Sequence, residues 1–240
     1  MTFRECFRAL NRPGASVLLI VLLCCDLAFV VLHFANVLSP QLRNPLFNIE
    51  CDRGYAEAFQ YAKYSLILVS LVLTAWKNRV WRYVSWVLVL GYFLADDSLK
   101  LHEQLGALLA EKLDFIPPLG LKLQDFGELA VSASAGSLLL IAGVFAYRGG
   151  SADFKKTSKD LTLLILLLVF FGVVVDMVHS AIDMGRPIGL ILEFVEGGGE
   201  MLSVSLLAWY SLLPIVRDGN ANCYRSEEHT SELQSLRHLV

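Results

Sequence analysis

The sequence contains too little charge for a water-soluble protein. Only 18% of its 240 residues are charged, whereas 55% are hydrophobic and the mean hydropathy is +0.56. This balance excludes an ordinary soluble domain, because such a domain needs a surface richer in charge. The sequence also lacks a basic patch of the kind that binds nucleic acid. We therefore expect an integral membrane protein that is surrounded by the lipid bilayer and has no nucleic-acid partner.

Common catalytic and redox motifs are missing as well. None of the five cysteines has the CxxC spacing of a metal-binding or redox pair. The sequence has no Ser, His and Asp in the order of a hydrolase triad, and no glycine-rich phosphate-binding loop. Its hydrophobic segments lack the two-residue alternation of a membrane β-barrel, so in lipid they must be helices.

Six hydrophobic segments are long enough to cross a bilayer. A hydrocarbon core of about 30 Å needs ~20 helical residues. We therefore predict an all-α fold in which residues 1–224 form a single membrane domain, with six transmembrane helices around a polar, outward-facing cavity. The predicted spans lie at about residues 14–37, 56–76, 80–101, 124–147, 161–183 and 188–214.

The last sixteen residues differ from the rest of the chain. The run RSEEHTSELQSLRHLV, from Arg225 to Val240, is polar and follows an apolar sequence abruptly. It resembles the translation of a sequencing-library adapter. We interpret residues 225–240 as a non-native tail and leave them out of the fold prediction.

Basic residues predict the orientation of the spans. The connections after the second and fourth spans are rich in Lys and Arg, whereas those on the opposite side mix basic with acidic residues. Under the positive-inside rule the basic side faces the cytoplasm. We therefore expect both termini in the cytoplasm and the protein in a plasma membrane, which in a bacterium is the inner membrane.

Histidines and acidic residues gather on the opposite side. His33, His102 and His179 lie near the outward-facing ends of three spans. A charged group in hydrocarbon costs about 2.5–3.5 kcal/mol even on lenient scales. Residues three, four or seven apart share a helix face, so acids with this spacing are expected to point into a common polar centre. Such acids are Asp125 and Glu128 in the fourth span, Asp176 in the fifth, and Glu193, Glu196 and Glu200 in the sixth.

Two acids lie deeper than the others. At a rise of about 1.5 Å per residue, Asp26 and Glu200 lie ~18 Å inside their spans, near the bilayer midplane. We predict that Asp26, Glu128 and Glu200 form the deep polar or proton-relaying part of the cavity. The glycines at 197–199 allow two interpretations, either close helix packing or an unwound turn whose carbonyl groups line the cavity.

The densest polar run, DDSLKLHE, covers residues 96–103 at the end of the third span. Asp96, Lys100 and Glu103 share a helix face, and one interpretation is that Lys100 neutralises Asp96. His102 and Glu103 also place a metal ligand and a candidate base side by side.

Three imidazoles and several carboxylates are a donor set typical of transition-metal sites. Zinc enzymes use three protein ligands and leave a position open for water, and iron sites favour mixed His and carboxylate ligands. The string DMVH at residues 176–179 has the acid-x-x-His spacing of metal-binding helices. We therefore predict a zinc or iron site. Its predicted ligands are His33, His102, His179, Asp176 and Glu196.

Three runs carry a resemblance to known families: LADDSLKLHEQLG, DMVHSAID and EFVEGGGEML. They resemble a group of uncharacterised bacterial multi-pass membrane proteins. The chain is also faintly similar to the ceramidase-like membrane hydrolases, which hold zinc with three histidines and an aspartate, although that superfamily has seven spans. This similarity implies that the three histidines bind the metal and that Asp97 or Ser98 positions the attacking water. The candidate catalytic residues are Asp97, Ser98 and Glu103.

Three functions follow from this pattern. The first is a metal-dependent hydrolase or oxidase acting on a lipid or small amphiphile, because a site of this kind meets its substrate in the bilayer. The second is a proton- or cation-coupled transporter in which Asp26, Glu196 and Glu200 relay charge. The third is a non-catalytic assembly or sensor protein. The cytoplasmic halves of the spans are almost purely apolar, which argues against conduction in the resting state.

Overall fold

The computed structural model describes residues 13–39, 41, 44–49, 51–114, 122–181 and 185–237. These residues form helices and connections without any strand, which confirms the all-α prediction. The α-helices are α2 (Pro13–Leu38), α3 (Tyr55–Asn78), α4 (Val84–Leu99), α5 (Leu101–Ala110), α6 (Leu123–Arg148), α7 (Ala152–Val169), α8 (Asp176–Ala181) and α9 (Gly185–Arg237). Two short 3-10 helices, η2 (Pro45–Phe47) and η3 (Trp81–Tyr83), and one π-helical segment, η5 (Phe170–Val175), connect or extend them.

Five stretches are long and apolar enough to cross a membrane. They are Gly14–Leu38, Tyr55–Asn78, Leu123–Arg148, Ala152–His179 and Ile188–Val216. Each corresponds to one predicted span. Large apolar side chains also cover the outside of the bundle, such as Val17 on α2 and Phe145 on α6, which are 57% and 73% exposed. A surface of this kind is suited to contact with lipid rather than with water.

The predicted third span, 80–101, is not one continuous helix. A 3-10 turn at Trp81–Tyr83 precedes α4, which has only 16 residues and ends at Leu99. Lys100 then adopts a left-handed conformation with φ 52°, and α5 begins at Leu101. At 1.5 Å per residue α4 is about 24 Å long, shorter than a typical hydrocarbon core. The break redirects the polar run 96–103 around a corner.

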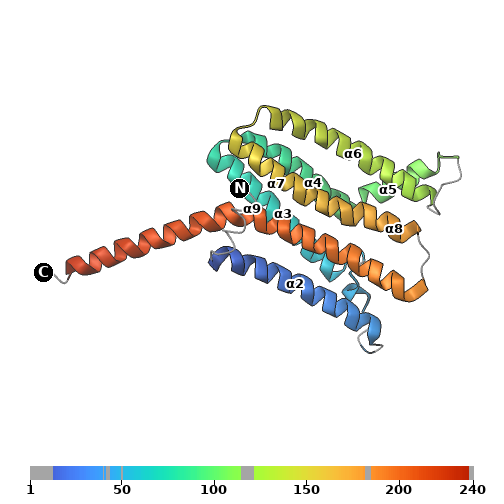
Figure 1. Ribbon diagram of the computed structural model, residues 1–240, viewed down its shortest axis with the longest axis horizontal. Helices are drawn as coiled ribbons and strands as arrows, with labels where there is room; N and C mark the ends of the chain where they lie inside the picture. Colours follow the sequence, from blue (N-terminus) through green and yellow to red (C-terminus); the bar gives the residue numbers. More distant parts are fainter. Residues whose placement is uncertain are drawn as a thin grey trace.

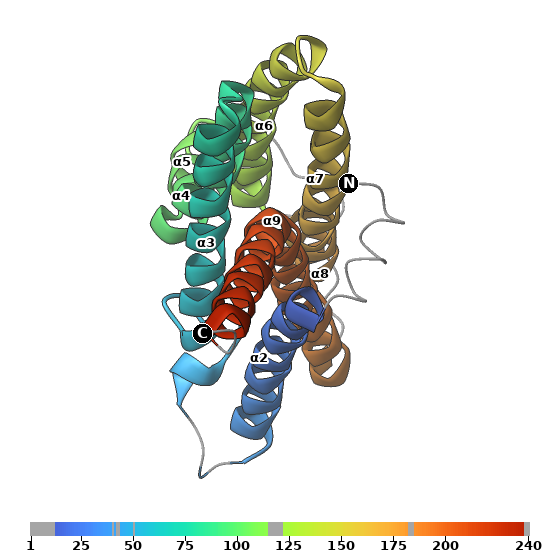
Figure 2. The same cartoon turned by 90° about the vertical axis from the view of Figure 1, so that its left-hand side faces the viewer.

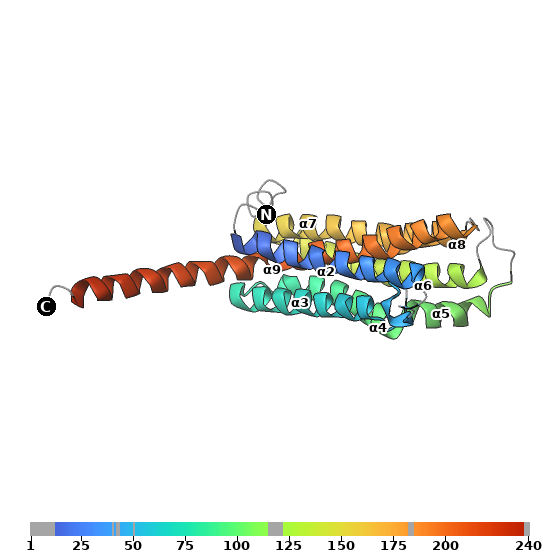
Figure 3. The same cartoon turned by 90° about the horizontal axis from the view of Figure 1, so that it is seen from below.

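Helix α9 lies at the centre of the bundle. Helices α2, α3 and α7 pack around it, as Figures 1 and 2 show. Fully buried side chains from these helices form the apolar core, including Ile67 on α3, Leu161 on α7, and Val204 and Leu207 on α9. Beyond the bundle the backbone of α9 continues as a helix that projects away from the other helices (Figure 3). The interpretation of residues 225–240 as a non-native tail stays a prediction.

Glycines set close contacts of α9 with its neighbours. The stretch 197–199 is helical, so the unwound-turn interpretation is wrong and the packing interpretation is correct. A Cβ atom on Gly197 would collide with the side chain of Ile49, and one on Gly199 would collide with the ring of Phe171. Small residues here let the loop before α3 and the π-helical segment approach the α9 backbone.

Candidate functional site

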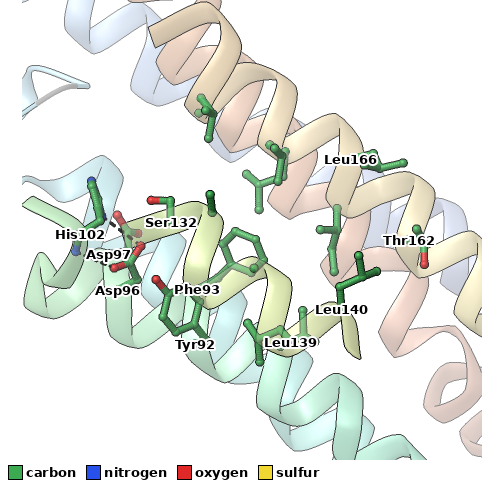
Figure 4. Close-up of a pocket in the computed structure, with 18 of the residues that line it drawn as sticks. Tyr92, Phe93, Asp96, Asp97, His102, Ser132, Leu139, Leu140, Thr162 and Leu166 are labelled. Atoms are coloured by element: carbon green, nitrogen blue, oxygen red, sulfur yellow. Dashed lines mark hydrogen bonds and ion pairs between the residues drawn. The ribbon is translucent and has the colours of Figure 1, made fainter. Parts of the chain in front are cut away.

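A pocket of about 640 Å³ lies between α3, α4, α6, α7 and α9 and is open to the outside along α6 and α7, where the lining residues Leu140 and Leu166 are 66% and 59% exposed. Asp96, Asp97 and His102 lie close to Ser132 at one end (Figure 4). The remainder is lined mostly by apolar side chains such as Phe93 and Leu140, with uncharged polar residues including Ser158 and Thr162 between them. The carboxylates that line the pocket are those of Asp96, Asp97, Asp125, Glu128, Asp176 and Glu200.

The break between α4 and α5 forms the polar end. Because Lys100 turns the chain, the first turn of α5 folds back over the last turn of α4. The Asp96 carboxylate then accepts hydrogen bonds from the His102 backbone N–H at 2.9 Å and pairs with His102 Nδ1 at 3.0 Å. An acid at this position also satisfies a free N–H in the first turn of α5 and complements its dipole. Asp96 therefore holds both the helix start and the imidazole.

The Asp96 hydrogen bond raises the pKa of His102 above its ordinary value. Partial burial acts in the opposite direction, and the negative charges of Asp96, Glu128 and Glu103 add to the upward shift. His102 is consequently more readily protonated than a free histidine. A protonated imidazole is the one cationic side chain among the residues that line the pocket.

Two glycines fix α6 against α5. A Cβ atom on Gly106 would lie 2.6 Å from the backbone nitrogen of Glu128, and one on Gly127 would collide with the Gly106 carbonyl oxygen. The backbones can therefore touch only because both residues lack a side chain. This crossing sets Glu128 at the pocket, where Gln124 Nε2 donates a 2.8 Å hydrogen bond to its carboxylate.

The far wall of the polar end contains the π-helical segment. A Cβ atom on Gly172, within η5, would collide with Glu200 Oε1, so the Glu200 carboxylate rests over bare backbone. Asp176 directly follows η5, and both acids line the pocket. Single π turns often occur at functional sites. The apolar sequence of the fifth span gave no sign of this one.

The structure brings together five of the predicted site residues. Asp97, His102, Glu128, Asp176 and Glu200 all line the pocket. They come from α4, α5, α6, α8 and α9, as the shared polar face predicted. Asp125 and Ser132, which lie about two turns apart on α6, line it as well. Whether any of these residues acts in catalysis stays a prediction.

The other two predicted metal-ligand histidines lie elsewhere. His33 is 1% exposed, accepts a hydrogen bond from the Ile49 backbone N–H at 3.4 Å through Nδ1, and packs edge-on against Phe34. His179 pairs through Nδ1 with Glu196 Oε2 at 2.9 Å. The three histidines thus have three separate partners. Within the described residues, no group of three His, Cys, Asp or Glu side chains is arranged to hold a metal ion.

Ser98 and Glu103 do not line the pocket. The Ser98 hydroxyl donates to the Leu94 carbonyl oxygen of its own helix at 2.6 Å. Glu103 pairs with Lys100 at 3.3 Å, and Lys100 also forms an ion pair with Asp52. The interpretation that Lys100 neutralises Asp96 is therefore wrong, because the left-handed turn at Lys100 directs its ammonium group to other acids.

Asp26 belongs to a second polar centre, which sequence reasoning missed. Lys63 on α3 is 1% exposed, and its Nζ lies 3.0 Å from Asp26 Oδ1, 2.9 Å from the Met201 carbonyl oxygen and 3.1 Å from Ser205 Oγ. Ser205 in turn donates to Asp26 Oδ2 at 2.5 Å. The group is buried between α2, α3 and α9. A lysine in the middle of the second apolar span was the signal that could have identified the partner of Asp26.

Gln60 is the second residue whose importance was missed. It lies on α3 at the pocket and is 9% exposed, and its Oε1 has no hydrogen-bond partner among the described residues. An unpaired buried acceptor is costly, so it points to a donor that is supplied by something in the pocket.

Comparison with known proteins adds a family. Residues 18–214, which include all the described residues that line the pocket and nearly all of each span, match the family described as Domain of unknown function (DUF8692). Neither the curated proteins nor the solved structures gave a significant match. Because the match covers most of its length, the chain belongs to this family of unknown function.

Proposed function

We propose that this chain is an integral membrane protein that binds a lipid-like amphiphile in the pocket between α3, α4, α6, α7 and α9. In this proposal η3 and α4 form a sixth membrane segment and α5 lies at the membrane surface. The polar end of the pocket faces away from the cytoplasm, and the membrane is a bacterial inner membrane. The polar end of the ligand lies among the carboxylates near His102. Its apolar chain lies between α4, α6 and α7.

The proposal rests on the separation of charged and uncharged residues along the pocket. Acids, His102 and Gln60 lie at one end, whereas the part lined by residues 139–169 contains no charged side chain. A small polar solute would not need that apolar length, and an ordinary acyl chain would not need the acids. A ligand with one polar end and one long apolar part matches both.

Filling the apolar part of the pocket tests the proposal. Gly136 and Gly143 line it, and a Cβ atom on either would meet no other atom within 4 Å. We expect Gly143→Phe to reduce binding of a fluorescent single-chain amphiphile to protein in nanodiscs by about tenfold or more, because the ring competes for the same volume. Gly189→Phe is the matched control, since Gly189 also has open space around it but lies outside the pocket. Equal binding by all variants would overturn the proposal.

A second candidate function is hydrolysis of the bound amphiphile. The observation that favours it is the Asp96–His102 pair, because a carboxylate on Nδ1 orients an imidazole as a general base for water. Glu103 and Ser98 have other partners, so His102 is the better candidate for this role. His102→Gln should then abolish turnover while preserving amphiphile binding. Turnover that survives this substitution would exclude the role.

The metal site predicted from the sequence does not fit the described residues, because His33 and His179 face other partners than His102. We therefore assign no step to a metal. Elemental analysis of detergent-purified protein decides the question: stoichiometric zinc or iron that is lost in His102→Ala would support the prediction, and background levels would contradict it.

The transporter alternative has less support. A proton or cation path would need titratable groups along the whole pocket, whereas the charged residues that line it are confined to one end. Asp26 and Glu196, two of the three predicted relay residues, have close partners outside the pocket, Lys63 and His179 respectively. Nothing in the described geometry favours a sensor or assembly role over ligand binding.

A further inference from the structure

The polar end of the pocket is almost entirely acidic. Among the described residues, six carboxylates line the pocket and His102 is the one basic side chain that does so. Two lysines of neighbouring elements are already paired: Lys63 with Asp26, and Lys100 with Asp52 and Glu103. Ionised carboxylates at membrane depth are costly without a counter-ion. The site therefore lacks positive charge of its own for most of its acids.

Gln60 provides an independent indication of the missing group. Its side chain is nine-tenths buried and lines the pocket beside Tyr64 on α3, and in the part of the chain that the structure describes its Oε1 accepts no hydrogen bond. An orphaned acceptor in a pocket of carboxylates requires a donor. An ammonium group has three N–H donors and a positive charge, so it satisfies both the amide oxygen and the acids.

The apolar part of the pocket indicates the chemistry of the remainder of the ligand. An inorganic cation would satisfy the acids but would leave the region near Phe93, Leu140 and Leu166 empty (Figure 4). Apolar lining of this extent is typical of sites that bury a hydrocarbon chain. Charge and lining together describe one molecule, a chain of hydrocarbon with a cationic nitrogen at its end.

We propose that the pocket selects amphiphiles that carry a protonated amine, such as a long-chain primary amine, with the ammonium group between Gln60 and the carboxylates of Glu128, Asp176 and Glu200. This inference rests on the proposed amphiphile-binding function and adds the chemistry of the headgroup. Anionic lipids would be rejected by the same acids, since like charges repel.

Ligands that share one hydrocarbon chain and differ in the headgroup test amphiphile binding and the amine preference separately. The protein is placed in nanodiscs of zwitterionic lipid, and a fluorescent amphiphile is displaced with dodecylamine, dodecanol or dodecyl sulfate. We expect dodecylamine to compete at least about tenfold more strongly than dodecanol, and dodecyl sulfate to compete least. Equal competition by dodecylamine and dodecanol would overturn the headgroup inference but leave amphiphile binding intact. Absence of competition by all three would overturn both.

Substitutions then locate the headgroup. Glu128→Gln and Asp176→Asn, made separately, each should weaken dodecylamine about tenfold and leave dodecanol within about twofold. Gln60→Leu should lose part of the same preference, because it removes the acceptor and keeps the volume. Glu111→Gln is the matched control, since Glu111 is exposed at the end of α5 and does not line the pocket. Thermal unfolding of each variant shows that it is folded, and an unchanged amine preference in all three folded pocket variants would refute the inference.

Discussion

Replacing Lys63 with Met should destabilise the helical bundle by about 3–5 kcal/mol, because it removes one partner of a buried ion pair. Lys63 Nζ bonds to Asp26, to the Met201 carbonyl oxygen and to Ser205, and both ionisable side chains are nearly inaccessible. In the variant, Asp26 keeps only the 2.5 Å hydrogen bond from Ser205. Most of the loss comes from leaving a carboxylate without its cation, since single hydrogen bonds between membrane helices contribute only about 0.6 kcal/mol on average.

A double-mutant cycle tests this reasoning. Asp26→Leu should be as harmful as Lys63→Met, because it leaves a buried ammonium group unpaired, whereas the double variant should recover much of the stability. Lys112→Met is the control, since Lys112 is exposed. The measurement is the unfolding free energy in a mild detergent with a graded denaturant. Additive losses in the double variant, or a loss in Lys63→Met no larger than in the control, would refute the account of this centre.

Three further predictions address other parts of the structure. The pKa of His102 is raised above its ordinary value of 6.5, so its contact with Asp96 stabilises the fold fully below pH 6.5 and loses this effect as the pH rises through the pKa of the folded state. The difference in unfolding free energy between wild type and His102→Gln should therefore shrink with rising pH. A difference independent of pH would contradict the contact. Gly106→Val should lower the unfolding free energy by about 1–3 kcal/mol, because the added side chain forces α5 away from α6. Gly136→Val should lower it less, since there is open space around Gly136. Equal shifts of the melting temperature in the two variants would refute the close crossing. Single cysteines at Gln41 and Lys112 should react with a membrane-impermeant reagent from the outside and one at Lys156 should not, with the reverse pattern contradicting the proposed orientation.

The fold was largely predictable because hydrophobic length determines which segments can cross a membrane. Five of the predicted spans correspond to helices in the structure. The third did not, because its hydropathy continues through Lys100 whereas its backbone turns there with a positive φ. A left-handed lysine is uncommon, and it is accompanied by a tertiary ion pair with Asp52 and a local one with Glu103. Nothing in the apolar sequence of the fifth span predicted the π-helical segment beside Glu200.

The candidate site was predictable only in part. Helical spacing directed Glu128, Asp176 and Glu200 toward a common polar centre, and all three line the pocket, because residues on one face of a helix point the same way. Spacing does not give the rotation of one helix relative to another, so it could not tell that His179 turns to Glu196 or that His33 contacts Ile49. Lys63 could have been singled out as a charge within an apolar span. The unpaired oxygen of Gln60 could be found only in three dimensions.

Mapping where a bound amphiphile lies in the protein tests the central proposal most directly. A single-chain alkylamine with a diazirine in its tail is bound to the protein in nanodiscs, irradiated, and its attachment sites are mapped by peptide mass spectrometry. The proposal predicts labelling on the faces of α6 and α7 that line the pocket, for example at Leu139 and Leu168, which are less exposed than the outer surface, and loss of that labelling in Gly143→Phe. Labelling confined to outer surfaces such as Val17 and Val31 of α2, unchanged in Gly143→Phe, would contradict it.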